Sequence, residues 1–242
     1  MSGIVVLSTD TPHHRYFINF LEQAGVPLAA YLFETKLAAP SFPVGPVFEE
    51  QEHAFEMAEF FRHVSSELDV KKLQLCESVG GSRAIELLEQ LKPDFGVVFG
   101  TGKLPKKVIG MFRYGIINVH RGMSEGYRGL DSDLWAIYHG DYNSLGVTIH
   151  RVDESLDTGN VISHEQMALL PGMRVWQIRY YTTLIATRLV HHALKDYLSG
   201  SLKDRRQLAV GRYYSFMPLE LKKVVAEKFN RYCDQLRAHI AA

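Results

Sequence analysis

Cysteine is scarce in this sequence of 242 residues, which holds only Cys76 and Cys233, far apart and outside any Cys-x-x-Cys motif. So sparse a set argues against a disulfide framework and against a cysteine-based zinc site. Two reduced thiols are typical of a cytoplasmic protein, and we expect that location.

Long hydrophobic runs are also missing. No apolar stretch approaches the roughly 20 residues that span a bilayer, so we expect no membrane partner. The start of the chain has only one short apolar run, at residues 4–7, with no basic segment ahead of it. A signal peptide would need both a basic segment and a longer apolar run.

An excess of charge of one sign is the third absence, because 27 Lys and Arg balance 27 Asp and Glu. Proteins that bind nucleic acid through overall basicity carry clustered positive charge, so we do not expect a nucleic-acid partner. The rest of the composition, 46% hydrophobic and 22% charged, is that of an ordinary globular protein. A chain of this length can bury about three-quarters of its unfolded surface.

Apolar runs of strand length alternate with stretches of helical spacing along the chain. This alternation predicts an α/β fold, a Rossmann-like, mostly parallel sheet with helices on both faces. We expect residues 1–199 to form one domain and residues 200–242 to form a short C-terminal extension of loop, aromatic strand and helix. Strands are predicted at 4–7, 28–33, 73–76, 95–99, 116–120, 144–152 and 161–167, and helices from 12 to about 25, at 48–68, 82–91 (with Ser82 as N-cap), 105–109, 131–138, 174–198 and about 219–239.

Polar side chains at strand ends are the first candidates for a site, because such sheets bind ligands beyond the carboxyl ends of their strands. Asn118 and His120 stand two apart at the end of a predicted strand, so they point to the same face. Three glycines in the next nine residues, 121–129, indicate a sharply turning loop. The pair either satisfies loop backbone groups or forms part of a site, and the glycine-rich loop favours the site.

A second polar element, residues 152–159, places three acids and a glycine between two predicted strands. It is either a hairpin or Ω-loop with Asx turns, or the source of a carboxylate that fixes the tautomer of His120 and raises its basicity. Spacing does not say which acid would do this.

Taken together, Asn118-Val-His120, Tyr127-Arg-Gly129, Gly146-Val-Thr-Ile149 and Asp153-Glu-Ser-Leu-Asp-Thr-Gly159 resemble the formyltransferase family that uses 10-formyltetrahydrofolate. Its members include methionyl-tRNA formyltransferase and the amino-sugar N-formyltransferases. The resemblance is strongest from about residue 91 to 167. It implies a catalytic Asn118, His120 and Asp157, with no metal.

The resemblance also implies two loops that hold the folate and a loop that shapes the acceptor entry. The implied folate-binding residues are Gly100, Thr101, Gly102, Lys103, Leu104, Val152, Asp153, Glu154 and Ser155, and the implied substrate-binding residues are Met123, Tyr127 and Arg128. Arg128 either binds an acceptor phosphate or carboxylate or braces its loop.

These residue types suit formyl transfer. The transfer from N10 of the folate to an amine passes through a tetrahedral oxyanion, which an amide donor such as Asn118 can stabilise by roughly 3 kcal/mol. His120 can share in that stabilisation or move the proton of the amine, and Asp157 can orient His120.

Departures from the family pattern bear on the acceptor. Many members carry His-Pro-Ser-Leu-Leu-Pro where this chain has His120-Arg-Gly-Met-Ser-Glu125. The extension is too short for the barrel that tRNA formyltransferases add, so we predict a small amine, most of all an amino-sugar nucleotide, as acceptor. The alternatives are another small amine, an aminoacyl-tRNA, hydrolysis of the formyl donor, and a non-catalytic binder. A homodimer is an open alternative for the assembly.

Other residues receive plainer predictions. We expect surface or interface roles for His13-His14 and His191-His192, because neighbouring residues on a helix rarely ligate one ion together. His150 either faces the acceptor or is a satisfied core or surface residue, and we expect the second. Trp135 and Tyr138 are expected to pack in the core. Residues 212–214 either stack on a base or sugar or pack the extension onto the domain.

Overall fold

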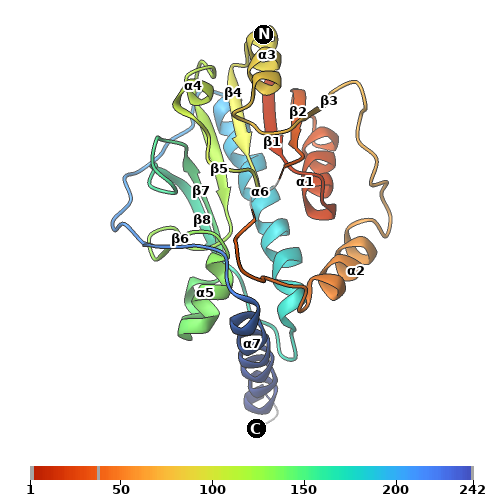
Figure 1. Cartoon of the computed structure of the whole chain (residues 1–242), viewed down its shortest axis with the longest axis vertical. Coiled ribbons are helices and arrows are strands. Elements are labelled where there is room, and N and C mark those ends of the chain that lie inside the picture. Colours follow the sequence, from red (N-terminus) through yellow and green to blue (C-terminus); the bar gives the residue numbers. More distant parts are fainter. Residues whose placement is uncertain (1–2, 37–38, 241–242) are drawn as a thin grey trace.

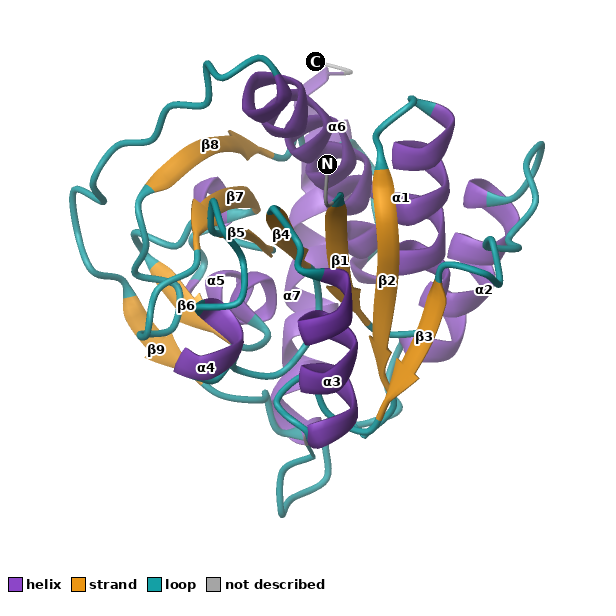
Figure 2. Cartoon of the chain, turned by 90° about the horizontal axis from the view of Figure 1, so that it is seen from above, coloured by secondary structure: helices purple, strands orange, loops and turns teal. Residues whose placement is uncertain are grey.

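The structure, a computed structural model, describes residues 3–36 and 39–240. Its main sheet has seven strands in the order β3-β2-β1-β4-β5-β7-β8. The strands from β3 to β5 run parallel, whereas β7 runs antiparallel to β5 and β8 antiparallel to β7 (Figure 2). The strands are β1 (Ile4–Ser8), β2 (Leu28–Glu34), β3 (Leu73–Cys76), β4 (Phe95–Val98), β5 (Ile116–His120), β7 (Gly146–Arg151) and β8 (Val161–Gln166).

Helices cover both faces of this sheet (Figure 1), so the predicted α/β class is confirmed. Alternate residues of β1 explain the two layers, because Ile4 and Val6 join the core under α1 and α6, while Val5 and Leu7 join the core under α3 and α4. All four are buried, which accounts for an unbroken apolar run instead of an alternating one. The helices are α1 (Pro12–Gln23), α2 (Glu49–Phe60), α3 (Ser82–Leu91), α4 (Lys106–Ile109), α5 (Ser132–His139), α6 (Ile178–Leu198) and α7 (Leu219–Ile240).

The C-terminal extension packs against the segment that follows β5. Its strand β9 (Arg212–Tyr214) pairs in parallel with β6 (Tyr127–Gly129) in a separate two-stranded sheet. Its helix α7 shares a third apolar core with α5. The division of the chain at residue 199 stays a prediction, but both predicted elements of the extension are present.

Some helix boundaries differ from the prediction. The helix predicted at 48–68 ends at Phe60, where the C-cap Phe61 leaves helical geometry with φ of −108° and ψ of 17°. Beyond it the backbone carbonyls of Ser65 and Ser66 accept side-chain hydrogen bonds from Asn19 and Arg15. Gly81, not Ser82, is the N-cap of α3. A 3₁₀ turn over residues 175–177 precedes α6, where one continuous helix was expected.

The order of strands creates a switch point between β1 and β4, where successive connections leave in opposite directions. Crevices at such points are the usual ligand sites of open α/β sheets. The residues that follow β1, β4 and β5 meet there. No helix in the described part of the chain is long and apolar enough to cross a membrane.

We predict that Phe17→Ala lowers the free energy of unfolding by about 3–5 kcal/mol, because Phe17 is fully buried between α1 and the sheet and its loss leaves a cavity. Leu208→Ala, at a side chain that is 86% exposed, is the control and should change the free energy of unfolding by less than about 0.5 kcal/mol. Urea unfolding of both variants checks this, and equal effects would contradict the assignment of the core.

Candidate active site

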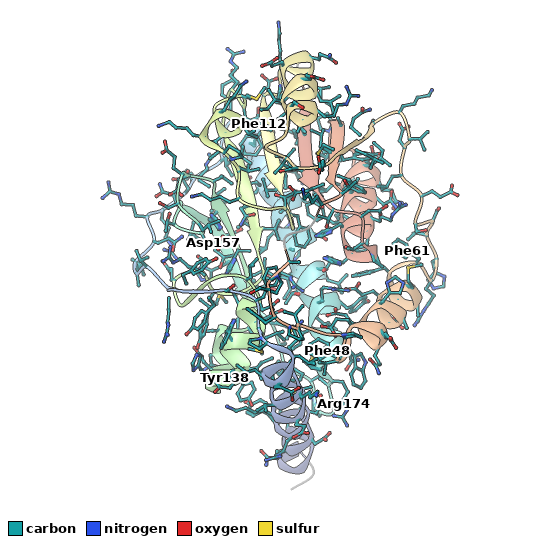
Figure 3. All side chains as sticks on the ribbon, in the orientation of Figure 1. Phe48, Phe61, Phe112, Tyr138, Asp157 and Arg174 are labelled. Atoms are coloured by element: carbon teal, nitrogen blue, oxygen red, sulfur yellow. The ribbon has the colours of Figure 1, made fainter. Side chains whose placement is uncertain are left out.

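A cavity of about 550 Å³ opens at the switch point. Its wall is built from the ends of β1, β2, β4, β5 and β7, the start of α1, one residue of α6 and part of the C-terminal extension. Figure 3 places Asp157 on the side of the molecule where β7 lies. Among the predicted site residues, those that line the cavity are Gly100, Thr101, Gly102, Lys103, Leu104, Asn118, His120, Val152, Asp153, Ser155 and Asp157.

Asp157 lies at the centre of the polar wall. One carboxylate oxygen, Oδ1, lies 3.3 Å from Nδ2 of Asn118 and 3.3 Å from Nε2 of His150. The other, Oδ2, accepts a 2.8 Å hydrogen bond from the backbone N–H of Gly129 and lies 3.5 Å from Nδ1 of His120. The structure therefore brings the three predicted catalytic residues together and adds His150 to them.

The backbone at Asp157 is in the left-handed region, with φ of 54°. A residue other than glycine adopts this region at a cost, typically where the surroundings hold it there. At Asp157 this backbone conformation lets the side chain face β5, which its carboxylate contacts require.

Two carbonyl contacts assign the histidine tautomers, because a carbonyl oxygen only accepts. His120 Nε2 lies 2.8 Å from the Tyr127 carbonyl and therefore carries a hydrogen. A neutral His120 thus has its lone pair on Nδ1, the atom that faces Asp157. His150 Nδ1 donates to the Arg151 carbonyl at 2.8 Å.

The second histidine fixes the amide of Asn118. Nε2 of His150 lies 3.1 Å from Nδ2 of Asn118. The same Nδ2 donates to Asp157. The predicted alignment of Asn118 and His120 is thus correct, and both side chains point toward one carboxylate.

Burial and charge set the protonation of the pair. Burial acts to raise the pKa of Asp157, but His120, His150 and the N–H of Gly129 outweigh it and hold that pKa well below its ordinary value. Burial lowers the pKa of His120 from 6.5, although the Asp157 charge opposes this. At neutral pH the site therefore pairs an ionised carboxylate with a neutral imidazole, a combination that can accept a proton.

A buried acid at the end of β2 fixes the loop that follows β4 in place. Glu34 accepts hydrogen bonds from the backbone N–H of Gly102 and of Val79. Gly100 has a φ of 83°, and a Cβ there would lie 2.5 Å from the ring of His14, so no other residue fits. Val98, Leu104 and Val152 add an apolar part to this end of the cavity.

His13 and His14 were expected at a surface or interface, and this prediction is wrong. They are only 5% and 4% exposed and line the cavity, because α1 begins where β1 ends. Burial, followed by neighbouring charge, keeps the pKa of each well below 6.5. Behind them Arg179 of α6 pairs with Glu56 and Glu52, and burial raises the pKa of Glu52 to about 7.

The three residues predicted to bind substrate do not line the cavity. Arg128 donates to the carbonyls of Gly211 at 2.6 Å and Leu156 at 3.0 Å, so the loop-bracing alternative describes it. Tyr127 offers its backbone carbonyl to His120, and the Met123 carbonyl accepts from Gly126 and Tyr127.

Three further predictions concern residues around the cavity. The side chain of Glu154 pairs with Lys106 and is not among the lining residues, and its folate-binding role stays a prediction. His150 is buried and hydrogen-bonded, as expected of a core residue, and its contact with Asp157 also places it in the site. Trp135 is partly buried and stacks on Tyr214, whereas Tyr138 is exposed.

The extension adds an aromatic part to the wall, where Tyr213 and Phe216 line the cavity. Residues 212–214 were predicted as a stacking or packing segment, but Phe216 was not singled out although the same aromatic run contains it. In the described ranges, no group of three or more His, Cys, Asp or Glu residues is arranged to hold a metal ion.

Comparison with known proteins identifies the family to which this chain is similar. The sequence model of the formyl transferase family matches residues 47–182. The methionyl-tRNA formyltransferase of Myxococcus xanthus is 35% identical over 127 residues, which are 52% of this chain and 40% of that protein. That of Thermodesulfovibrio yellowstonii is 34% identical over 138 residues, 56% of this chain and 44% of that protein. The chain thus spans less than half the length of these relatives.

Solved structures share the fold at low identity. A sugar N-formyltransferase from a Shewanella species aligns with a TM-score of 0.61 and 14% identity, over 88% of this chain and 76% of that one. HypX from Aquifex aeolicus, in complex with tetrahydrofolic acid, aligns with a TM-score of 0.62 and 17% identity, over 96% of this chain and 34% of that one. A formyltransferase from Anoxybacillus kamchatkensis, in complex with a UDP-linked formamido sugar and tetrahydrofolate, aligns with a TM-score of 0.55 and 17% identity, over 88% of this chain and 86% of that one.

The depressed pKa of Asp157 predicts a pH dependence of stability. A carboxyl whose pKa is lower in the folded state stabilises the fold above its unfolded pKa of about 3.9 and loses this effect as pH falls toward the folded value. We expect Asp157→Asn to lower the unfolding free energy by about 1.5–3 kcal/mol at pH 7. The difference from wild type should shrink between pH 5 and 3 in urea titrations, and a constant difference would contradict the assignment.

Proposed function

This chain belongs to the formyl transferase family, and from that membership we propose that it transfers a formyl group from 10-formyltetrahydrofolate to a primary amine. One observation supports this most strongly. Asn118, His120 and Asp157 meet on the wall of one cavity that also takes in most of both predicted folate loops.

In the proposed reaction His120 is the proton acceptor. Its Nδ1 is the free nitrogen of the neutral ring, because Nε2 is held by the Tyr127 carbonyl. When the amine attacks the formyl carbon, its proton passes to Nδ1, and the imidazolium that forms lies 3.5 Å from the Asp157 carboxylate. The ionised partner stabilises that charge, as a positioned acid–base pair requires. The bond between that carbon and N10 then breaks, and the imidazolium gives its proton to N10 as tetrahydrofolate leaves, which returns His120 to its neutral form.

Asn118 is the proposed donor to the oxyanion. Its two amide hydrogens are engaged by His150 and Asp157 in this structure. Stabilising a developing oxyanion therefore requires one of these contacts to give way or be shared. The hydrogen bond to the ionised Asp157 is charge-assisted and therefore the stronger of the two, so the contact with His150 is the one we expect to yield.

The cavity suits a folate in its chemistry. Val98, Leu104 and Val152 give an apolar floor, and the loop of residues 100–104 presents backbone groups held in place by Glu34. When bound, 10-formyltetrahydrofolate supplies the activated formyl carbon. The solved relatives in complex with tetrahydrofolate support this choice of donor.

For the acceptor we propose an amino-sugar nucleotide. The structural relatives that are sugar N-formyltransferases support it, as does the balanced charge of the chain. The second candidate is an aminoacyl-tRNA, which is favoured by the methionyl-tRNA formyltransferases among the sequence relatives. The two buried free cysteines fit our proposal that the reaction takes place in the cytoplasm.

We predict that His120→Ala and Asp157→Asn each lower the turnover of formyl transfer by at least about 100-fold, because each removes part of the acid–base pair. His192→Ala, on the exposed side of α6, is the matched control and should keep wild-type turnover. Near-native rates in both site variants would refute their assignment.

The reaction class is tested by the release of tetrahydrofolate from 10-formyltetrahydrofolate with and without candidate amines. Release that depends on an amino-sugar nucleotide is the expected result. Release without any amine would indicate a hydrolase, and tight binding without turnover a binding protein. Thermal shifts with the same amines rank the acceptors, because a ligand at 100 times its dissociation constant stabilises the fold by about 2.7 kcal/mol.

A further inference from the structure

The C-terminal extension reaches the site through residues 204–211, a segment without a helix or strand apart from an isolated β-bridge at Arg205. This segment contacts the loop that carries Asp157. At one end the backbone of Arg205 exchanges two 2.8 Å hydrogen bonds with Val161. At the other end the Gly211 carbonyl accepts from Arg128, whose guanidinium also holds the Leu156 carbonyl.

Charged pairs fasten the same segment to the elements on either side. Asp204 accepts from Arg151 of β7 at 3.0 Å and from Asn160 at 2.8 Å. Arg205 pairs with Glu125 at 2.7 Å, and Glu125 also accepts from the backbone N–H of Leu208. The segment is therefore fixed at several points before it enters β9.

Gln207 lies between these fixed points and contacts the loop directly. Its Nε2 donates to the carbonyl of Asp157 at 2.8 Å and to that of Gly159 at 2.9 Å. Both partners only accept, so the amide nitrogen must face them and each of its hydrogens serves one carbonyl. Its Oε1 is buried without a hydrogen-bond partner in the described structure.

The two carbonyls bracket the strained part of the loop. Asp157 has its left-handed φ of 54°, and two residues later Gly159 passes so close to Arg151 that a Cβ would lie 1.8 Å from the Arg151 carbonyl oxygen. Holding both carbonyls restricts the peptide unit between Asp157 and Thr158 and the one between Gly159 and Asn160. This restriction determines the direction in which the Asp157 carboxylate leaves the backbone.

That direction matters because the contact with His120 is already long. Oδ2 of Asp157 lies 3.5 Å from Nδ1 of His120, so a small displacement of the loop weakens an attraction that falls with distance. Supporting groups that fail to hold a site residue within a fraction of an ångström are a common reason for lost activity.

We propose that Gln207 is a positioning residue for the transfer, holding the loop so that the Asp157 carboxylate stays opposite His120. The role of Gln207 in the transfer rests on the proposed function, whereas its contacts with the loop do not. It makes the C-terminal extension a working part of the site, not a separate appendage.

The test compares Gln207→Met, which keeps the length of the side chain but removes the donors, with the wild type. Gln166→Met is the matched control, because Gln166 also bridges two oxygens, both on Asn143, but lies exposed at the end of β8. The ring pKa of His120 is measured by NMR titration, and Asp157→Asn serves as the reference for complete loss of the carboxylate charge.

We expect the His120 pKa to fall in Gln207→Met toward the Asp157→Asn value, because the charge that raises it has moved away. Gln166→Met should match the wild type. With a working acceptor, kcat should fall roughly 10- to 100-fold while KM for the acceptor changes less. If Gln207→Met does not fold, Gln207→Asn, which is too short to reach both carbonyls, replaces it.

A folded variant whose His120 pKa is unchanged or raised would overturn the proposal, whatever its rate. The titration needs no acceptor, so it separates two failures. A wild type that transfers no formyl group would remove the proposed function, while the NMR comparison would still decide whether Gln207 positions Asp157.

Discussion

The rest of the site depends on the interactions of the Asp157 carboxylate. It contacts an imidazole on β5, an imidazole on β7, an amide on β5 and a backbone N–H at the end of β6. Removing it would leave two buried histidines without an acid, and it would free the amide of Asn118. Its ionised state follows from these contacts, the neutral state of His120 follows from burial, and the proposed chemistry follows from both.

The sheet makes this arrangement possible by joining two directions of strand. The parallel strands β4 and β5 end at the cavity. After a connection that contains β6 and α5, β7 runs antiparallel to β5 and brings His150 beside Asn118, with which it is paired in register. The loop between β7 and β8 then returns Asp157 to the same edge. A wholly parallel sheet would have placed a crossover helix there and lengthened the path between these residues.

Much of this could be predicted from the sequence, and the failures have physical causes. The alternation of runs predicted the α/β class, and the spacing of two between Asn118 and His120 predicted their common face. Spacing alone could not select Asp157 among three acids; only the family resemblance did. His13 and His14 were misjudged because they were weighed as metal ligands on a helix, although a helix that starts directly after β1 brings its first turn to the switch point.

His150 and Gln207 lay further from sequence reasoning. His150 sits in an alternating strand, where a buried histidine looks the same whether it packs or takes part in a site. Gln207 contacts a carbonyl 50 residues away, and no local pattern encodes such a partner. The cavity-lining residues Tyr213 and Phe216 and the positioning residue Gln207 reach the site only when the whole chain has folded.

The central claim is that a neutral His120 beside an ionised Asp157 accepts the proton of the attacking amine. The pH dependence of single-turnover formyl transfer from 10-formyltetrahydrofolate tests it most directly. The account predicts a level rate at high pH that falls about tenfold per pH unit below an apparent pKa under 6.5. A rate that stays constant through this range, or that rises as the pH falls, would contradict it.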